Sequence, residues 1–441
     1  MNKRYLIKTY GCQMNVHESE KIAGQLQTLG YEETQTAEDA DVIVFNTCCV
    51  RENAEQHASG NIGMYKKLKK EKKDLVIAVC GCMTQQGEFA KKLSATFPFV
   101  DVIIGTYNID EFGKILQKTV DTKKRVVEIL DKNGDICEEI TPHRSSYPNA
   151  WVNIAYGCNN FCTYCIVPYV RGRERSRLPE NVVDEVKNLV NEGYKEITLL
   201  GQNVNSYGHD LKNDVGFASL LDEIGKIEGK FRLRFMSNHP KDLTEDVIEA
   251  IKRNPHACHA IHLPVQSGSN RILSLMNRRY SVEKYLSQIE SIRKIIPDCA
   301  ITTDIIVGFP TETEEDFIDT VKLVETVKFD GAFTFVYSKR EGTKAAIMDG
   351  QIDPEIQKDR IMRLIDVQNE LNRKESLTYV GKTVEILVED FDEKKNSYMG
   401  RDERGKMAYF SCNENVIGKF VNVKITSAGG MSLMGEIIEI L

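Results

Sequence analysis

The sequence of 441 residues predicts an α/β protein with three folded parts. Strand-like and helix-like segments alternate over residues 1–120, which predicts a parallel sheet built from βαβ units. The alternation returns over residues 151–376 with six strand segments and a trailing charged helix, which predicts a partial (β/α)6 barrel. Over residues 377–441 apolar residues recur at every second position between glycine turns, which predicts a small β-barrel. Residues 121–150 contain two prolines and form an irregular connection, in which a hairpin is the candidate regular element.

The first part contains four short β-branched runs that are typical of buried parallel strands. These runs are Tyr5–Thr9, Asp41–Asn46, Leu75–Cys80 and Val100–Ile104. Between the first two runs, a helix over Ser19–Leu29 places Ile22, Leu26 and Leu29 on one face. The charged run Lys66–Lys73 is typical of a solvated helix end.

The second part has six strand candidates separated by helical patterns. The strands are Val152–Tyr156, Glu196–Leu200, Phe231–Phe235, Ala260–Leu263, Ala300–Val307 and Ala332–Val336. The helices lie around residues 180–192, 216–227, 244–253, 282–294 and 314–327, and a long charged helix covers 354–377. In a barrel of this kind the active centre lies at the C-terminal ends of the strands.

The last part alternates with period two in three runs, which predicts a barrel of the nucleic-acid-binding kind. The runs are Thr383–Val388, Lys419–Ile425 and Gly435–Ile440. Residues 378–441 contain 8 Lys and Arg against 10 Asp and Glu, so charge alone does not support RNA binding there.

Composition excludes several classes of protein. No apolar run approaches the ~20 residues that a membrane span requires. The N-terminal segment lacks a secretory apolar stretch, so we expect a cytoplasmic protein. The 12 cysteines are then poor disulfide candidates, and metal or catalytic roles are favoured. The net charge of −7 argues mildly against a nucleic-acid partner, although local basic patches decide such binding.

Three cysteines lie within eight residues, in the segment Cys158–Cys165. Cys158, Cys162 and Cys165 are separated by three and then two residues, so one tight loop can direct all three sulfurs to one point. Three thiolates bind three irons of a [4Fe–4S] cluster and leave the fourth iron open. The alternatives are a structural zinc knuckle and a chance grouping. Structural zinc takes four ligands, and no fourth Cys or His lies nearby at a suitable spacing, so the cluster is favoured.

A second set of three cysteines follows the first three predicted strands. Cys12, Cys48 and Cys82 each come directly after a strand, and the carboxyl ends of parallel strands share one sheet edge. These thiols can therefore converge and bind a second cluster with an open iron. The alternative is that they are small buried residues in tight turns. The rival ligands are Cys49 and Cys80, and the glycines directly before Cys12 and Cys82 favour Cys82 over Cys80, because glycine lets the backbone approach a bulky cofactor.

These motifs resemble the radical S-adenosylmethionine (SAM) methylthiotransferase family. The Cys158-x3-Cys162-x2-Cys165 loop resembles the radical SAM signature. Three boxes around the second cysteine set resemble the methylthiotransferases, namely Gly-Cys-Gln-Met-Asn, Asn-Thr-Cys-x-Val-Arg and Gly-Cys-Met-x-Gln. The segment Ile166–Arg177 and the last domain, which is similar to the TRAM domain, extend the resemblance over nearly the whole chain. Gln13-Met14-Asn15 is similar to the MiaB type within this family.

The resemblance implies a methylthiotransferase that modifies carbon 2 of N6-dimethylallyladenosine, next to the anticodon at position 37 of tRNAs. It implies two [4Fe–4S] clusters, one SAM as radical source and a second SAM as methyl donor. The six cysteines are then the candidate catalytic residues: Cys158, Cys162 and Cys165 bind the SAM cluster, and Cys12, Cys48 and Cys82 bind the auxiliary cluster. The implied partners are tRNA and a flavodoxin- or ferredoxin-like electron donor, without a membrane, and we expect a monomer.

Two other functions compete with this interpretation. The first is the same chemistry on threonylcarbamoyladenosine or on a ribosomal protein, and the Gln13-Met14-Asn15 box argues against it. The second is a zinc-stabilised RNA-binding protein without catalysis, and the two triplets of ligands argue against that.

The resemblance also implies cofactor contacts outside the cysteines. Tyr164 is expected near the SAM adenine. Gly201 and Gln202 end the second barrel strand and are candidate SAM contacts, with an ordinary βα turn as the alternative. Gln266 and Ser267 follow the fourth strand and are candidates for the SAM ribose or carboxylate. Asp304 lies in the fifth strand, where it is expected to point into the barrel and contact a polar group or cofactor, because a lone buried carboxylate is costly.

The candidate RNA contacts are basic and aromatic residues. The four arginines of the segment after Cys165 recur at every second position, so in an extended chain they line one face and suit phosphates or the SAM carboxylate: Arg171, Arg173, Arg175 and Arg177. The alternative is a solvated loop that pairs with nearby carboxylates. Tyr409 and Phe410 in the last domain are candidates for stacking on RNA bases, and one of them is expected in the barrel core by alternation.

Overall fold

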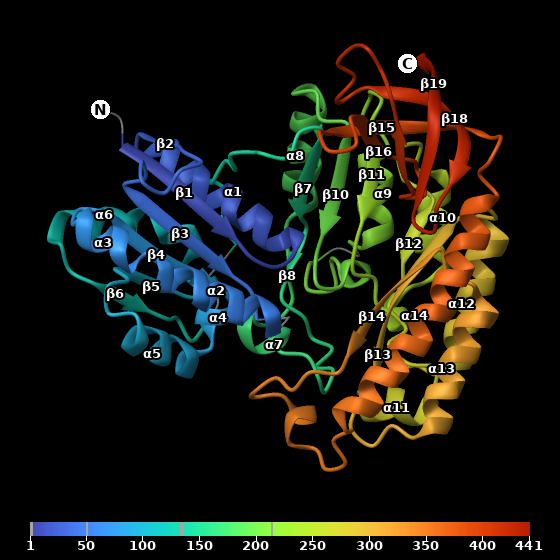
Figure 1. Cartoon of the computed structure of the whole chain (residues 1–441), viewed down its shortest axis with the longest axis horizontal. Helices are drawn as coiled ribbons and strands as arrows, with labels where there is room; N and C mark the ends of the chain where they lie inside the picture. Colours follow the sequence, from blue (N-terminus) through green and yellow to red (C-terminus); the bar gives the residue numbers. More distant parts are fainter. Residues whose placement is uncertain (1–2, 50–51, 133–135, 213–214) are drawn as a thin grey trace. The chain divides into compact units, whose positions relative to one another are not determined.

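The structure is a computed structural model that describes residues 3–49, 52–132, 136–212 and 215–441, without the side chains of residues 52–57. Val50 and Arg51 of the second cysteine box lie outside the described residues. The chain divides into two compact units (Figure 1). The first unit comprises residues 1–145, 156–159 and 165–175, and the second comprises 146–155, 160–164 and 176–441. Each unit is described by itself.

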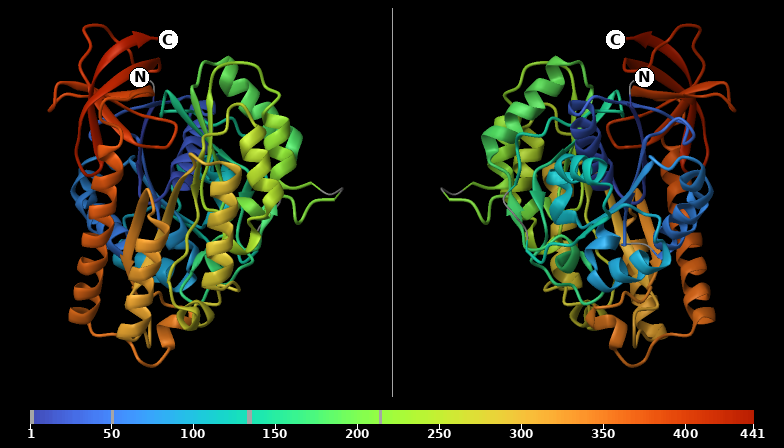
Figure 2. Two further views of the ribbon diagram at one scale, coloured as in Figure 1. Left: turned by 90° about the vertical axis from the view of Figure 1, so that its right-hand side faces the viewer. Right: turned by 90° about the vertical axis from the view of Figure 1, so that its left-hand side faces the viewer.

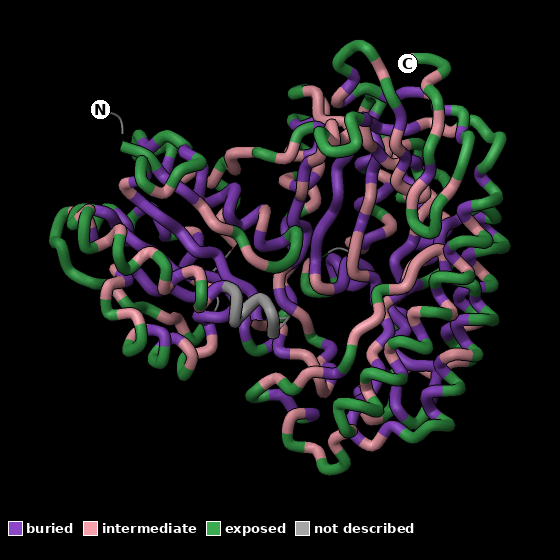
Figure 3. Tube along the Cα trace, in the orientation of Figure 1, coloured by how far each residue is buried: buried purple, intermediate pink, exposed green. Residues whose placement is uncertain are grey.

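The first unit is built on a six-stranded parallel sheet, as the alternating pattern predicted. Its strand order is β2-β1-β3-β4-β5-β6. The strands are β1 (Lys3–Thr9), β2 (Tyr31–Glu33), β3 (Val42–Thr47), β4 (Val76–Gly81), β5 (Val102–Ile104) and β6 (Val126–Glu128). The central strands are buried from end to end, as Figure 3 shows. The expected connection contributes the parallel strand β6 rather than a hairpin, because residues 126–128 extend the edge of the sheet beside β5.

Helices cover both faces of this sheet. They are α1 (Gln13–Thr28), α2 (Glu52–Met64), α3 (Lys66–Glu71), α4 (Cys82–Gln85), α5 (Gly87–Thr96), η1 (Thr106–Glu111), α6 (Phe112–Thr122) and α7 (Val167–Val170). One apolar layer packs Ile22 of α1 and Phe112 of α6 against the sheet. The opposite layer contains Ile62 of α2, Met83 of α4 and Val170 of α7. The segment after Cys165 is therefore part of the core of the first unit.

The second unit contains six parallel strands in two three-stranded sheets, which confirms the partial (β/α)6 barrel. The sheets have the orders β11-β10-β7 and β12-β13-β14, and an isolated bridge pairs Leu233 of β11 with Ala257, three residues before β12. The strands are β7 (Asn149–Asn153), β10 (Glu196–Leu200), β11 (Arg232–Phe235), β12 (Ala260–His262), β13 (Ala300–Val307) and β14 (Gly331–Val336). Two further short strands, β8 (Ala155–Tyr156) and β9 (Arg175–Ser176), pair with each other.

The helices of the second unit follow the strands at the predicted places. They are α8 (Pro179–Asn191), α9 (Phe217–Ile224), α10 (Glu245–Arg253), α12 (Val282–Ile295), α13 (Glu314–Val327) and α14 (Pro354–Leu377), with the short segments η2 (Val204–Ser206), η3 (Pro240–Asp242), α11 (Asn270–Leu275) and η4 (Lys344–Ile347). Thr313 caps α13 in a reciprocal capping box with Asp316, which explains why this helix begins where the sequence predicted. None of the described helices is long and apolar enough to cross a membrane.

The chain ends in a closed five-stranded barrel, as predicted, into which α14 leads directly (Figure 2). Its strands are β15 (Thr383–Asp392), β16 (Ser397–Arg401), β17 (Met407–Phe410), β18 (Phe420–Ala428) and β19 (Ser432–Ile440). The core of this barrel includes Ile386, Phe410, Val421 and Leu433. The sequence missed β16 and β17, which are too short to display a period.

Candidate active site

The second set of cysteines lies on turns at the carboxyl edge of the first sheet. Cys12 follows β1 and precedes α1, Cys48 follows β3, and Cys82 is the first residue of α4 after β4. Cys12 is exposed, whereas Cys48 and Cys82 are buried. Strands β1, β3 and β4 are consecutive in the sheet, so the three turns are neighbours, as the parallel topology predicted.

Two glycines let these turns approach one another closely. Gly11 has φ +114°, and a Cβ added to it would lie 2.4 Å from Cβ of Cys48 and 2.8 Å from its Sγ. Gly81 has φ +104°, and a Cβ there would lie 2.3 Å from the carbonyl oxygen of Thr47. Only glycine satisfies both the positive φ and the space at these positions. The turns of Cys12, Cys48 and Cys82 therefore approach one another closely at these two glycines.

The two rival cysteines have different surroundings. Cys80 is fully buried in the apolar layer on the α1 side of the sheet, and burial raises the pKa of its thiol strongly. That position favours a role for Cys80 as a small buried core residue rather than as a cluster ligand. Cys49 lies in the opposite layer with Cys82. A hydrogen bond from Cys49 and the neighbouring Arg171 guanidinium lower the pKa of Cys82 despite its burial. Cys49 is thus a neighbour of the set, whereas Cys80 faces away from it.

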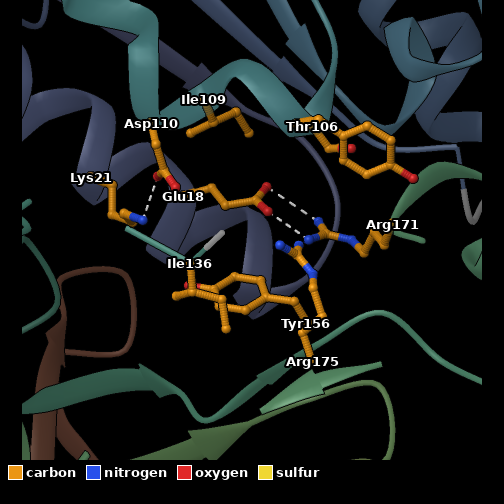
Figure 4. Close-up of a pocket in the computed structure, with 10 residues that line it drawn as sticks. Glu18, Lys21, Thr106, Ile109, Asp110, Ile136, Tyr156, Arg171 and Arg175 are labelled. Atoms are coloured by element: carbon orange, nitrogen blue, oxygen red, sulfur yellow. Dashed lines mark hydrogen bonds and ion pairs between the residues drawn. The ribbon is translucent and has the colours of Figure 1, made fainter. Parts of the chain in front are cut away.

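A polar pocket of the first unit lies between α1, η1 and the segment that carries Arg171 and Arg175 (Figure 4). Its empty volume is about 560 Å³, part of it open to solvent, and its lining residues are Glu18, Lys21, Thr106, Tyr107, Ile109, Asp110, Ile136, Tyr156, Arg171 and Arg175. The Arg171 guanidinium binds the Glu18 carboxylate, and the guanidinium of Arg175 lies 5.9 Å from the ring centroid of Tyr156. Burial lowers the pKa of Arg171, but the charges of Cys82, Glu18 and Cys12 outweigh burial. The net effect raises the pKa of Arg171 well above its ordinary value.

The cysteine loop Cys158–Cys165 has its ends in the first unit and its middle in the second. At its start, Gly157 has φ +78° and would place a Cβ 2.1 Å from the carbonyl oxygen of Arg173, and the Cys158 amide donates to the carbonyl of Gly172 at 3.1 Å. In its middle, the Thr163 amide donates to the carbonyl of Met276 at 3.1 Å. Both anchors are backbone contacts, so they hold the loop in place without using the cysteine side chains.

Arg278 is a residue of this site that the sequence analysis did not single out. It is 4% exposed, and its Nη1 donates to Sγ of Cys162 at 3.3 Å. Its Nη2 donates to the carbonyl of Pro264 at 3.0 Å, and its Nε donates to the hydroxyl of Tyr280 at 2.9 Å. The guanidinium is therefore held rigidly against the thiol. The available signal was an arginine pair with no acidic neighbour in the sequence, which is weak.

Buried amides at the ends of β7, β10 and β11 form a second group that sequence reasoning missed. Four asparagines have side-chain atoms that lack a hydrogen-bond partner among the described residues: Asn153, Asn203, Asn205 and Asn238. His239 follows them, and burial, together with the charges of Arg278 and Lys241, lowers its pKa to about 2. Its Nδ1 accepts from the amide of Lys241, so the neutral ring presents Nε2–H, which also lacks a described partner. Buried polar groups of this kind fit an uncharged polar ligand, because leaving them unsatisfied is costly.

The predicted SAM contacts differ in their burial and in their partners within the fold. Tyr164 is half-buried and packs against an apolar cluster that contains Phe309, near the end of β13. Gly201 and Gln202 directly follow β10, as predicted. Ser267 is fully buried, and its hydroxyl accepts from the amide of Ser269, so it is occupied within the fold.

Gln266 and Asp304 are tied to each other and to their neighbours. Gln266 has φ +71°, and its amide donates to the carbonyl of Asp304 at 2.8 Å. Asp304 is half-exposed, and its Oδ1 lies 3.5 Å from Nε2 of His262. The expected polar partner of Asp304 is therefore a histidine of this chain.

The expected row of four arginines is wrong, because the segment is not extended throughout. Helix α7 precedes Arg171, which is buried against Glu18. Arg177 is buried, and it donates to the Glu185 carboxylate at 2.6 Å and to the carbonyl of Asn153 at 2.9 Å. Only Arg173 is exposed, and Arg175 is half-buried. Arg171 and Arg177 thus form internal ion pairs with Glu18 and Glu185, partners that the sequence did not indicate.

The aromatic pair of the last barrel separates as alternation predicted. Phe410 is 2% exposed and lies in the barrel core, so its ring is closed to RNA bases. Tyr409 is half-buried, and the Nζ of Lys395 lies 3.7 Å from its ring centroid. The candidate for stacking is therefore Tyr409.

Among the described residues, no three His, Cys, Asp or Glu side chains are gathered as a metal ion would require. The donor set nevertheless fits iron–sulfur clusters, since each set supplies three cysteines beside glycines at close backbone approaches, and Arg278 lies beside Sγ of Cys162. The unsatisfied amides at the ends of β7, β10 and β11 fit the polar groups of SAM.

Three protein families match successive parts of the chain. Residues 4–105 match "Uncharacterized protein family UPF0004", residues 152–324 match "Radical SAM superfamily", and residues 377–438 match "TRAM domain". The match confirms SAM and [4Fe–4S] as the cofactors expected for the barrel part.

Curated relatives cover nearly the whole chain. A protein of Caldicellulosiruptor saccharolyticus named tRNA-2-methylthio-N(6)-dimethylallyladenosine synthase is 52% identical over 99% of this chain and 93% of its own length. Proteins with the same name are 53% identical in Clostridium botulinum (98% of this chain, 96% of theirs) and 49% identical in Thermoanaerobacter pseudethanolicus (100% and 94%). The chain belongs to this family. Its membership confirms the resemblance that the cysteine boxes carried.

Solved structures agree on the fold of this tRNA-2-methylthio-N(6)-dimethylallyladenosine synthase family member. The radical SAM methyltransferase TsrM from Kitasatospora setae, with tryptophan and a SAM analogue bound, has a TM-score of 0.60 at 14% identity and covers 79% of this chain and 75% of its own. The cobalamin-dependent radical enzyme OxsB has a TM-score of 0.54 at 13% identity, with 84% and 56% covered. At such identities the likeness concerns the fold alone.

Proposed function

We propose that this protein is a tRNA methylthiotransferase that modifies carbon 2 of N6-dimethylallyladenosine, beside the anticodon at position 37. The observation that carries the proposal is the near full-length similarity to relatives that bear this name. The radical SAM match and the two cysteine triplets support the same chemistry.

The six cysteines have separate roles in this proposal. Cys158, Cys162 and Cys165 hold the cluster that binds SAM, and Cys12, Cys48 and Cys82 hold the auxiliary cluster. When bound, these groups supply a radical from one SAM, a methyl group from a second SAM, and the sulfur. The surroundings of Cys80 support its exclusion from the ligand set.

The chain itself binds, orients and shields these groups. Arg278 holds Cys162 in one rotamer and adds a positive charge beside its sulfur, which makes reduction of a neighbouring cluster easier. The unsatisfied amides of Asn153 and Asn205 supply donors and acceptors for SAM. Tyr164 supplies an aromatic face close by. A shielded site matters because a primary carbon radical attacks most neighbouring C–H bonds.

The tRNA contacts are proposed on the last barrel and on the segment after α7. The TRAM match supports an RNA role for the barrel, where Tyr409 and Lys395 present a partly open aromatic ring and a cation. Arg173 is the exposed arginine that suits a phosphate. We further propose a cytoplasmic monomer that takes electrons from a flavodoxin- or ferredoxin-like protein.

The test of the cofactors is an iron and sulfide determination on protein purified without oxygen. About eight irons per chain are expected for two clusters. Cys12→Ala should leave about four irons and retain SAM cleavage to 5′-deoxyadenosine without methylthiolation. Cys158→Ala should abolish 5′-deoxyadenosine formation. The matched control is Cys412→Ala, a half-buried cysteine outside both sets, which should keep the full iron content. Zinc in place of iron would refute the proposal.

The test of the substrate is mass spectrometry of tRNA nucleosides from a strain that lacks the endogenous enzyme. Expression of this chain should restore 2-methylthio-N6-dimethylallyladenosine. A methylthio group on threonylcarbamoyladenosine instead would contradict the proposed substrate and leave the chemistry intact.

A further inference from the structure

A buried ion pair joins the segment after Cys165 to the first helix of the chain. Arg171 and Glu18 each have a side chain that is 6% exposed. Nη1 of Arg171 donates to Oε1 of Glu18 at 2.5 Å, and Nη2 donates to Oε2 at 3.2 Å. Figure 4 shows the two side chains meeting at the wall of the polar pocket. All of these atoms belong to the first unit.

Asn15 extends this pair to the turns of the second cysteine set. Nη2 of Arg171 also donates to Oδ1 of Asn15 at 2.9 Å. The amide of Asn15 donates to the carbonyl of Cys12 at 2.9 Å, and its Nδ2 donates to the carbonyl of Thr47 at 3.0 Å. Thr47 directly precedes Cys48. Through one fully buried asparagine, Arg171 is therefore linked to the turns that carry two of the three cysteines.

The other end of the link is the cysteine loop. Helix α7 spans the residues between Cys165 and Arg171, and Val170 is buried in the same apolar layer as Cys82. The hydroxyl of Thr106 donates to the carbonyl of Val170 at 2.5 Å. The path from Cys165 to Arg171 is thus short, helical and packed, so a displacement at Arg171 reaches Cys165.

Stability alone is a poor reason for this arrangement. A buried ion pair repays its desolvation only in part, and apolar residues of similar size often stabilise a protein as well or better. A bidentate guanidinium–carboxylate pair does, however, impose one geometry on the two segments that it joins. The pair therefore fixes the relative position of the two segments more than it stabilises the fold.

We propose that Arg171 is a positioning residue that holds the Cys165 end of the SAM-cluster loop in fixed register with the turns of Cys12, Cys48 and Cys82, and so couples SAM cleavage to methylthiolation. This inference rests on the proposed function. Neither Arg171 nor Glu18 takes part in the chemistry. They fix the Cys165 end of the loop relative to the turns of Cys12, Cys48 and Cys82, all within the first unit.

The test compares Arg171→Met and Glu18→Gln with a matched control. The control is Arg144→Met, which breaks the pair of Arg144 with Glu20 of the same helix α1, and the side chains of this pair are 7% and 2% exposed. The measured quantity is the ratio of 5′-deoxyadenosine to methylthiolated nucleoside, with iron content determined in parallel.

Both test variants should retain the wild-type iron content and cleave SAM while losing product. We expect the ratio to rise at least about tenfold, since a 1 Å misplacement can cost about 100-fold in rate. Arg171→Lys keeps the charge and one hydrogen bond to Glu18, so it should restore part of the coupling. The control variant should keep the wild-type ratio. An unchanged ratio in both test variants, or an equal rise in the control, would overturn the inference.

Hydrogen exchange supplies a readout that does not depend on catalysis. In the cluster-free full-length protein, the backbone amides of residues 166–171, apart from Pro168, should exchange faster in Arg171→Met than in the wild type and the control. Unchanged exchange would overturn the positioning role even if the unaltered protein made no methylthio product. Absence of that product would instead refute the proposed function, so the two failures are distinguishable.

Discussion

Replacing Arg278 by glutamine should lower the reduction potential of the SAM-binding cluster. Arg278 is buried, and its Nη1 lies 3.3 Å from Sγ of Cys162. Reduction adds negative charge to the cluster, and a fixed cation beside a ligand sulfur stabilises that charge. Loss of the cation therefore makes the cluster harder to reduce.

The magnitude follows from this separation. Two unit charges 3.3 Å apart interact by about 5 kcal/mol at an effective dielectric constant of about 20. For a one-electron couple, 59 mV corresponds to about 1.36 kcal/mol, so the ceiling is about 200 mV. The added electron is spread over the whole cluster, so we expect a fall of about 50–150 mV.

The assay is a redox titration monitored by electron paramagnetic resonance. It is performed in a Cys12→Ala background, which leaves the SAM-binding cluster as the source of the signal. Arg278→Lys keeps the charge and should recover at least half of the shift. Arg253→Gln removes an exposed cation that pairs with Asp222 and should leave the potential unchanged. A potential in Arg278→Gln that equals that of the parent protein would refute the reasoning.

Further predictions concern pH, the last barrel and the glycine cradle. Burial lowers the pKa of His239 to about 2, below the ordinary value near 6.5, so the unfolded chain binds one more proton below pH 6.5. The free energy of unfolding should therefore fall by up to about 1.4 kcal/mol per pH unit below pH 6.5. In His239→Gln, the free energy of unfolding from urea denaturation should depend less on pH over this range. Phe410→Ala should destabilise the last barrel by about 3–5 kcal/mol in thermal unfolding, as expected for a core aromatic. Tyr409→Ala should instead weaken tRNA binding in a filter assay at unchanged melting temperature. Gly81→Ala should reduce iron from about eight to about four per chain, because its Cβ would meet the carbonyl of Thr47, and a full complement would contradict the cradle.

The fold was largely predictable because its signals are local. Strand β13 and helix α13 have the predicted bounds, since a long β-branched run and a capping box are readable within one segment. Strands β2 and β6 were missed because they are short and mostly exposed, so no buried apolar run marks them, and only their neighbours in the sheet make them strands. The wrong arginine row has a similar cause: α7 turns the chain before Arg171, and packing of Val170 in the core decides that turn.

The sequence by itself determined the chemistry of this protein. The spacing of Cys158, Cys162 and Cys165 constrains three thiols within one short loop, and the parallel alternation places Cys12 and Cys82 at one sheet edge. Only the tertiary structure decided which groups surround those sulfurs. It turned Cys80 to the other face of the sheet, and it brought Arg278 to Cys162 across 116 residues and Arg171 to Glu18 across 153. The physical reason is that spacing governs geometry only within a turn or two of chain, whereas hydrogen bonds and charges act at distances that the packing of remote elements sets.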